Sequence, residues 1–91
     1  MLFLAKVRID EEKIMELGKK LETGKLDKSN IQMTRCLKED PAVGVSIWEV
    51  DTKEIFEAKI APFKEYYKEI YEISQVVLPE ESMKMLMDKL N

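Results

Sequence analysis

The side chains in this sequence best able to bind or react are two cations near the start of the chain. Lys6 and Arg8 stand two positions apart, so an extended strand would place both on one face. An ammonium and a guanidinium can hold an anionic ligand, the guanidinium by paired hydrogen bonds. The competing interpretation is that both reach solvent or pair with an acid, because buried unpaired charge is rare.

Cys36 and Trp48 are the only cysteine and the only tryptophan. A catalytic thiol needs a base or a positive neighbour, and the chain has no histidine, so a buried structural cysteine is the favoured interpretation. Trp48 can equally stack on a flat ligand or anchor a subunit interface. One cysteine forms no internal disulfide, and without histidine no zinc-type ligand set exists. We therefore expect no metal and no cofactor.

The charge distribution argues against two classes of partner. The 91 residues carry 18 acidic and 15 basic side chains, a net charge of −3, with no basic stripe for a nucleic acid. The apolar stretch at the start of the chain ends before Lys6. A stretch of this length is too short for the apolar core of a signal peptide or for a membrane span. We expect a cytoplasmic protein that binds neither nucleic acid nor membrane.

Alternating apolar and polar positions predict the elements that must hold these side chains. Strands are expected over residues 1–9, 31–37, 43–50 and 70–77. A first helix is expected over residues 11–22, ended by Gly24. A second follows its cap, Asp51, with Glu54 as the capping-box partner, and Pro62 interrupts it or restarts it as a short segment through Lys68. A last helix opens at Pro79.

This order predicts an α+β fold of the ferredoxin-like kind, β-α-β-β-α-β with an extra C-terminal helix, as one domain over residues 1–91. Right-handed crossovers place both main helices on one side of a four-stranded antiparallel sheet. The other sheet face is then open.

If the drier parity of each strand faces the helices, the open face is mixed in character. It carries Leu2, Leu4, Lys6, Arg8, Gln32, Thr34, Cys36, Ser46 and Trp48, with either Tyr71 and Gln75 or Glu72 and Ser74. A second copy stacked on this face would enclose a partly polar lumen. We therefore predict a homodimer, with the last helix packing across the joint through Met83, Leu86, Met87 and Leu90. The candidate ligand-binding cleft consists of Lys6, Arg8, Thr34, Cys36, Ser46, Trp48 and Tyr71.

The element order, the open sheet face and the ending Glu-Ile-Ser-Gln-Val-Val-Leu-Pro-Glu-Glu-Ser-Met resemble the dimeric α/β-barrel superfamily. That superfamily includes muconolactone isomerase-like and antibiotic-biosynthesis-monooxygenase-like proteins. The resemblance implies a cleft and a dimer, but not a particular reaction. Several enzymes and haem binders of the superfamily use a histidine that this chain lacks, which argues against catalysis here.

The sequence is therefore consistent with two functions from different classes. The first is a homodimeric binder of a small anionic or aromatic compound, or a cofactor-independent enzyme acting on one. The second is a non-catalytic assembly module whose open face serves only oligomerisation. RNA recognition uses the same element order, but Trp48 has no aromatic partner motif and the net charge is negative, so it is disfavoured.

Overall fold

The computed structural model describes residues 1–90 and contains the expected order of strands and helices. The elements are β1 (Leu2–Ile9), the 3₁₀ turn η1 (Glu11–Lys13), α1 (Ile14–Glu22), β2 (Ile31–Cys36), β3 (Val43–Glu49), α2 (Lys53–Ile60), the 3₁₀ segment η2 (Ala61–Tyr66), β4 (Tyr67–Val76) and α3 (Pro79–Leu90). The fold is ferredoxin-like with an extra C-terminal helix, as predicted.

Helix boundaries follow local chemistry, with two differences from expectation. Gly24 ends the first helical region at a φ of 75°, which an L side chain adopts only with strain. The cap of α2 is Thr52 rather than Asp51, because the Thr52 hydroxyl accepts a bond from the Ile55 amide. α2 becomes 3₁₀ just before Pro62, as predicted, and β4 then begins at Tyr67, three residues earlier than expected.

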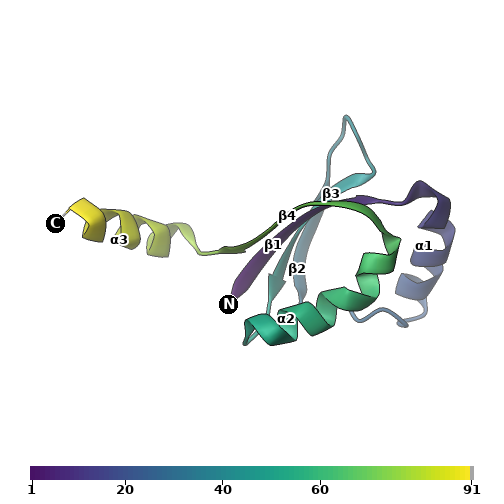
Figure 1. The fold of residues 1–91 in the computed structure, drawn as a ribbon, viewed down its shortest axis with the longest axis horizontal. Helices are drawn as coiled ribbons and strands as arrows, with labels where there is room; N and C mark the ends of the chain where they lie inside the picture. The colour runs from purple at the N-terminus through teal and green to yellow at the C-terminus, as the bar shows by residue number, and fades with distance from the viewer. Residues whose placement is uncertain (91) are drawn as a thin grey trace.

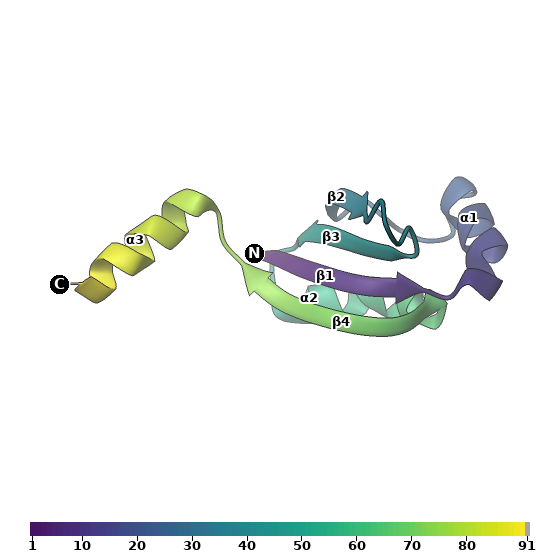
Figure 2. The same cartoon turned by 90° about the horizontal axis from the view of Figure 1, so that it is seen from above.

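The sheet has the strand order β2-β3-β1-β4, with every neighbouring pair antiparallel. α1 and α2 lie on the same side of it (Figure 1), which confirms the predicted layering. Both views place α1 beyond the ends of the strands, whereas α2 lies behind β1 and β4 (Figure 2). The helical layer therefore covers the sheet unevenly.

An aromatic cluster fills the space between the sheet and α2. Phe3 of β1 stacks on Phe56 of α2, with ring centroids 4.4 Å apart. Trp48 meets Phe56 and Phe63 edge-on, at 5.7 and 5.4 Å. All four side chains are buried. These contacts anchor α2 and η2 to the centre of the sheet.

The face assignment predicted for β3 is wrong. Phe3 lies directly opposite Trp48, and Ala5 opposite Ser46. Because directly paired residues share a face, Trp48 and Ser46 lie beneath the helices with Phe3 and Ala5. The open face instead carries Val45 and Ile47 from this strand. The more uniformly apolar parity of β3 is the one that the helices leave uncovered.

Two register irregularities also displace predicted face assignments. A shift in β2 after Ile31 places Thr34 opposite Ser46 and Cys36 opposite Gly44, on the helix side. A shift in β4 falls between the partners of Lys6 and Val7, where Tyr71 is the extra residue. Tyr71 therefore lies on the open face with its neighbour Glu72. The prediction required the two to lie on opposite faces.

α3 projects from the end of β4, away from the rest of the molecule (Figures 1 and 2). None of its described side chains is buried. The Cα radius of gyration is 15.1 Å, whereas a compact chain of this length has about 12 Å. The chain thus carries an element that its own fold does not cover.

Candidate functional site

The seven residues predicted to form one cleft lie on two faces of the sheet. Lys6, Arg8 and Tyr71 lie together on the open face, as predicted for them. Thr34, Cys36, Ser46 and Trp48 lie on the helix side, for the register reasons given above. The prediction of a single site on the open face is therefore wrong for these four residues.

On the open face, Arg8 is held between two partners. Its Nε donates to the Tyr71 hydroxyl at 2.8 Å, and its two terminal nitrogens bind the Asp40 carboxylate at 3.3 and 2.5 Å. This bond lowers the pKa of Asp40 below its usual value, and Asp40 and Tyr71 raise the pKa of Arg8. The guanidinium is thus paired with an acid, which is the competing interpretation stated for it from the sequence. Asp40 was expected only as a turn residue.

The helix side of the sheet contains a groove of about 790 Å³ between α1 and the strands β2 and β3. Its walls are mainly apolar. They include Ile14, Leu17 and Leu21 of α1, Ile31 of β2, and Ile9, Phe63 and Tyr67. The displacement of α1 beyond the strand ends leaves this part of the sheet without a helix over it. The groove is therefore a consequence of how the helical layer is placed.

Besides the exposed Thr34, two hydroxyl groups interrupt the apolar surface of the groove. Ser46 Oγ accepts a bond from the Trp48 indole at 2.8 Å, which leaves its own proton to donate elsewhere. Tyr67 is partly buried, and burial raises its pKa to about 12, so its phenol stays protonated near neutral pH. Trp48 borders the groove from beneath but is itself fully buried. It is therefore part of the core and not an exposed stacking platform.

Cys36 lies at the open edge of the groove and is exposed, which contradicts the favoured interpretation of a buried thiol. Its Sγ would lie 3.6 Å from a β-carbon placed on Gly44. The residues that the structure describes contain no group of three His, Cys, Asp or Glu side chains arranged to hold a metal.

Charged side chains border the groove rather than lying inside it. Lys28, Arg35 and Glu11 are all exposed lining residues. Arg35 also donates to the neighbouring Thr34 carbonyl at 2.9 Å. The groove therefore offers an apolar interior, two internal hydroxyls and an ionic rim with more positive than negative charge.

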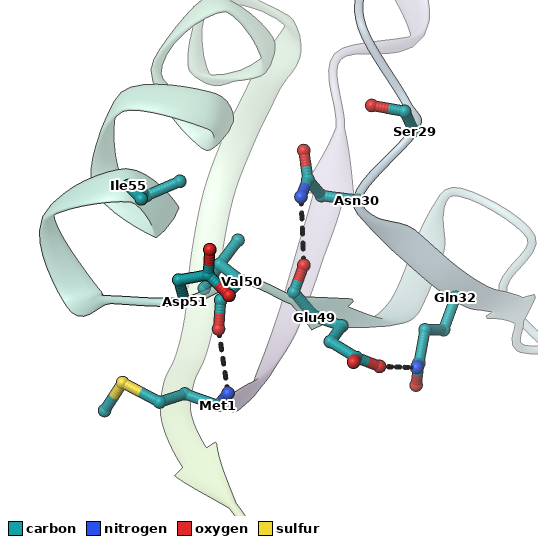
Figure 3. Close-up of a pocket in the computed structure, with 8 residues that line it drawn as sticks. All are labelled: Met1, Ser29, Asn30, Gln32, Glu49, Val50, Asp51 and Ile55. Atoms are coloured by element: carbon teal, nitrogen blue, oxygen red, sulfur yellow. Dashed lines mark hydrogen bonds between the residues drawn. The ribbon is translucent and has the colours of Figure 1, made fainter.

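A second hollow, of about 410 Å³, lies near the N-terminus and is polar (Figure 3). Its groups bind one another. The Met1 amino group donates to the Val50 carbonyl at 2.8 Å, and Asn30 donates to the Glu49 carbonyl at 3.0 Å. Gln32 bonds to the Glu49 carboxylate. These bonds close the ends of β1, β2 and β3, so the hollow is explained by the fold.

The α1 side chains are among the groove residues that sequence reasoning did not assign to a site. Leu17 and Leu21 were expected to face the sheet, but only as core. Tyr66, Tyr67 and Tyr71 were expected as possible cleft donors, with the alternative that at least two of them close the second helix over the sheet. No alternation of apolar and polar residues marks a groove wall, because the same side chains would look identical in a closed core. Among residues 1–90, no helix has the length and apolarity needed to cross a membrane.

No protein-family model matches the chain, and no curated protein matches it. Solved structures do match the chain in fold. A 5-chloro-2-hydroxyhydroquinone dehydrochlorinase from Burkholderia phenoliruptrix, in complex with 2,5-dihydroxybenzoquinone, is similar with a TM-score of 0.64 at 14% identity, covering 89% of this chain and 98% of the other. A proposed antibiotic biosynthesis monooxygenase from Bacteroides thetaiotaomicron is similar with a TM-score of 0.54 at 18% identity, covering 87% and 89%.

At these identities the likeness establishes the fold alone. It confirms, at the level of the fold, the predicted resemblance to antibiotic-biosynthesis-monooxygenase-like proteins.

Proposed function

We propose that this protein is a homodimeric binder of a small, mainly apolar ring compound, held in the groove between α1 and the strands β2 and β3. The groove itself is the observation that carries the proposal. Its volume lies within the range typical of ligand pockets, about 300–1,000 Å³, and an apolar lining with few polar groups is typical of such sites.

The polar groups of the groove narrow the class of ligand. Ser46 and Tyr67 both have a proton to donate, so oxygen acceptors such as carbonyls or phenolate oxygens would suit them. Lys28 and Arg35 at the rim would favour negative charge where the ligand meets solvent. An oxygen-substituted aromatic or quinonoid ring meets these conditions. The ligand named for the dehydrochlorinase structure, 2,5-dihydroxybenzoquinone, belongs to that class.

Binding is proposed ahead of catalysis because the groove offers few groups for moving protons near neutral pH. The chain has no histidine. The protonated phenol of Tyr67 is suited to donate a hydrogen bond rather than to act as a base. A cofactor-independent reaction would have to use Cys36 or Glu11, both of which are exposed.

The dimer is supported by surface that the single chain leaves uncovered. The accessible surface is 6803 Å², about 1,300 Å² more than the scaling law gives for a compact monomer of this mass. A standard interface buries about 800 Å² per partner. The open face presents Leu4, Val45 and Ile47, all only partly buried, beside the Arg8 cluster. Two such faces stacked together would cover each other.

The test of the groove is calorimetric titration with 2-hydroxy-1,4-naphthoquinone, a flat ring that carries oxygen acceptors. We expect saturable binding to the wild type. Cys36→Phe places a large ring at the groove edge and should weaken binding at least about tenfold. Tyr67→Phe removes one hydrogen bond, which is worth about 0.5–1.5 kcal/mol, or roughly 2- to 12-fold in affinity.

Tyr71→Phe is the matched control, since it removes the same hydroxyl from the open face and should leave the affinity unchanged. Circular dichroism verifies folding of each variant, and mass spectrometry excludes covalent addition to Cys36. Recovery of chemically altered probe would favour an enzyme over a binder. Loss of binding in Tyr71→Phe alone would place the site on the open face. Absence of binding by the wild type at millimolar probe would reject this ligand class and favour the assembly module.

A further inference from the structure

We infer that α3 docks on a second copy of this chain rather than on its own sheet, so that exchanged helices form part of the dimer interface. The inference rests on the proposed homodimer and adds to it the identity of a contact element. Its starting point is an apolar stripe that nothing in the described chain covers. Met83, Leu86, Met87 and Leu90 of this stripe are 59%, 54%, 58% and 86% exposed.

An uncovered helix of this kind needs a partner to be stable. α3 has 12 residues, and isolated helices shorter than about 12–15 residues are marginal in water. Amphipathic helices in proteins gain most of their stability from packing the apolar face. The stripe is therefore the part of α3 that must be buried.

The connection to β4 opposes burial against the helix's own sheet. Only Val77 and Leu78 separate the end of β4 from Pro79. Proline restricts the preceding residue to an extended conformation, so Leu78 continues the direction of the strand. The Ser82 amide already bonds to the Leu78 carbonyl at 3.0 Å, which fixes the start of the helix at that point. The chain therefore has no turn that would fold α3 back.

The rest of the molecule favours a second copy of the chain as the partner that covers the apolar stripe of α3. The same chain exposes an apolar sheet face, and the surface in excess of a compact monomer, about 1,300 Å², exceeds the about 800 Å² that each partner of a standard interface buries. A two-fold interface repeats every contact, so one association covers both helices and both faces. An anionic lipid surface is disfavoured, because α3 carries three acids, Glu80, Glu81 and Asp88, against Lys84 and Lys89.

The helix provides its own matched pair of test positions. Met87 lies on the stripe, whereas Met85 lies about 160° around the helix from it, on the opposite side. Both are about half exposed, at 58% and 52%. We expect Met87→Glu to raise the dimer dissociation constant at least about tenfold in sedimentation equilibrium, and Met85→Glu to change it less than about threefold.

Photo-cross-linking of the full chain distinguishes exchange from folding back. In a Cys36→Ser background, a benzophenone on Met87→Cys should join two chains, and the same label on Met85→Cys should do so weakly. A cross-link within one chain would overturn the inference. So would a wild-type dimer that Met87→Glu leaves unchanged, although the proposed homodimer would then stand. A wild type that stays monomeric at about 100 μM would overturn both.

Discussion

Replacing Trp48 distinguishes the packing seen in the structure from the open-face position expected from the sequence. The indole is fully buried, meets two phenyl rings edge-on and donates to Ser46. Removing a buried aromatic side chain costs about 3–5 kcal/mol. Native stability is about 0.05–0.15 kcal/mol per residue, so a chain of this length has roughly 5–14 kcal/mol in total. Trp48→Ala should therefore bring the protein close to unfolding.

Trp48→Phe keeps a ring against Phe56 and Phe63 but loses the bond to Ser46. The lost hydrogen bond costs about 1 kcal/mol and the cavity left by the smaller ring costs about as much again, so we expect this variant to lose about 2 kcal/mol. Tyr71→Ala, on the open face, should lose less than about 1 kcal/mol.

Urea unfolding followed by circular dichroism measures all three variants, at one protein concentration because a dimer's stability depends on it. A loss below about 1 kcal/mol for Trp48→Ala would refute the reasoning, since an indole that can be removed so cheaply is not in the core.

Two further substitutions test local assignments. Thr52→Ala should cost about 0.5–2 kcal/mol in urea unfolding because it removes the cap of α2, whereas Asp51→Ala should cost little; the reverse order would restore Asp51 as the cap. Asp40→Asn should lower the urea midpoint at pH 7, because the folded-state pKa of Asp40 is depressed by Arg8 and its stabilisation is complete only above the ordinary carboxyl value of about 3.9. The difference from wild type should shrink as pH falls below that value toward the lower folded pKa, and a difference independent of pH would contradict the ion pair.

The element order was predictable because each signal for it is local. Gly24 ends the first helical region, and α2 becomes 3₁₀ at the residue before Pro62. The parity of β1 was also predictable, since Phe3 and Ala5 share the buried face. These features depend on a few neighbouring residues whose conformational preferences agree.

The face of β3 was not predictable from alternation, because both of its faces carry large apolar side chains. Val45 and Ile47 form one and Trp48 belongs to the other, and the pattern does not say which of them a helix covers. The extra residues in β2 and β4 then reverse parity at points that no turn residue marks. Since the candidate site was assembled by parity, these errors placed groove residues and open-face residues in one predicted cleft.

One layer of helices cannot cover both sides of this sheet, so each side leaves surface for a different proposed partner. α2 and η2 cover the centre through Phe56 and Phe63, and α1 lies beyond the strand ends, so the helix side keeps a groove. No helix within residues 1–90 covers the opposite side. Successive residues of β3 alternate between them, with Ser46 at the groove and Val45 and Ile47 on the open face. A ligand in the groove and a second copy on the open face would therefore contact adjacent residues of β3. Because successive side chains of a strand point to opposite faces, the proposed ligand site and the proposed dimer interface are positioned by the same few peptide units.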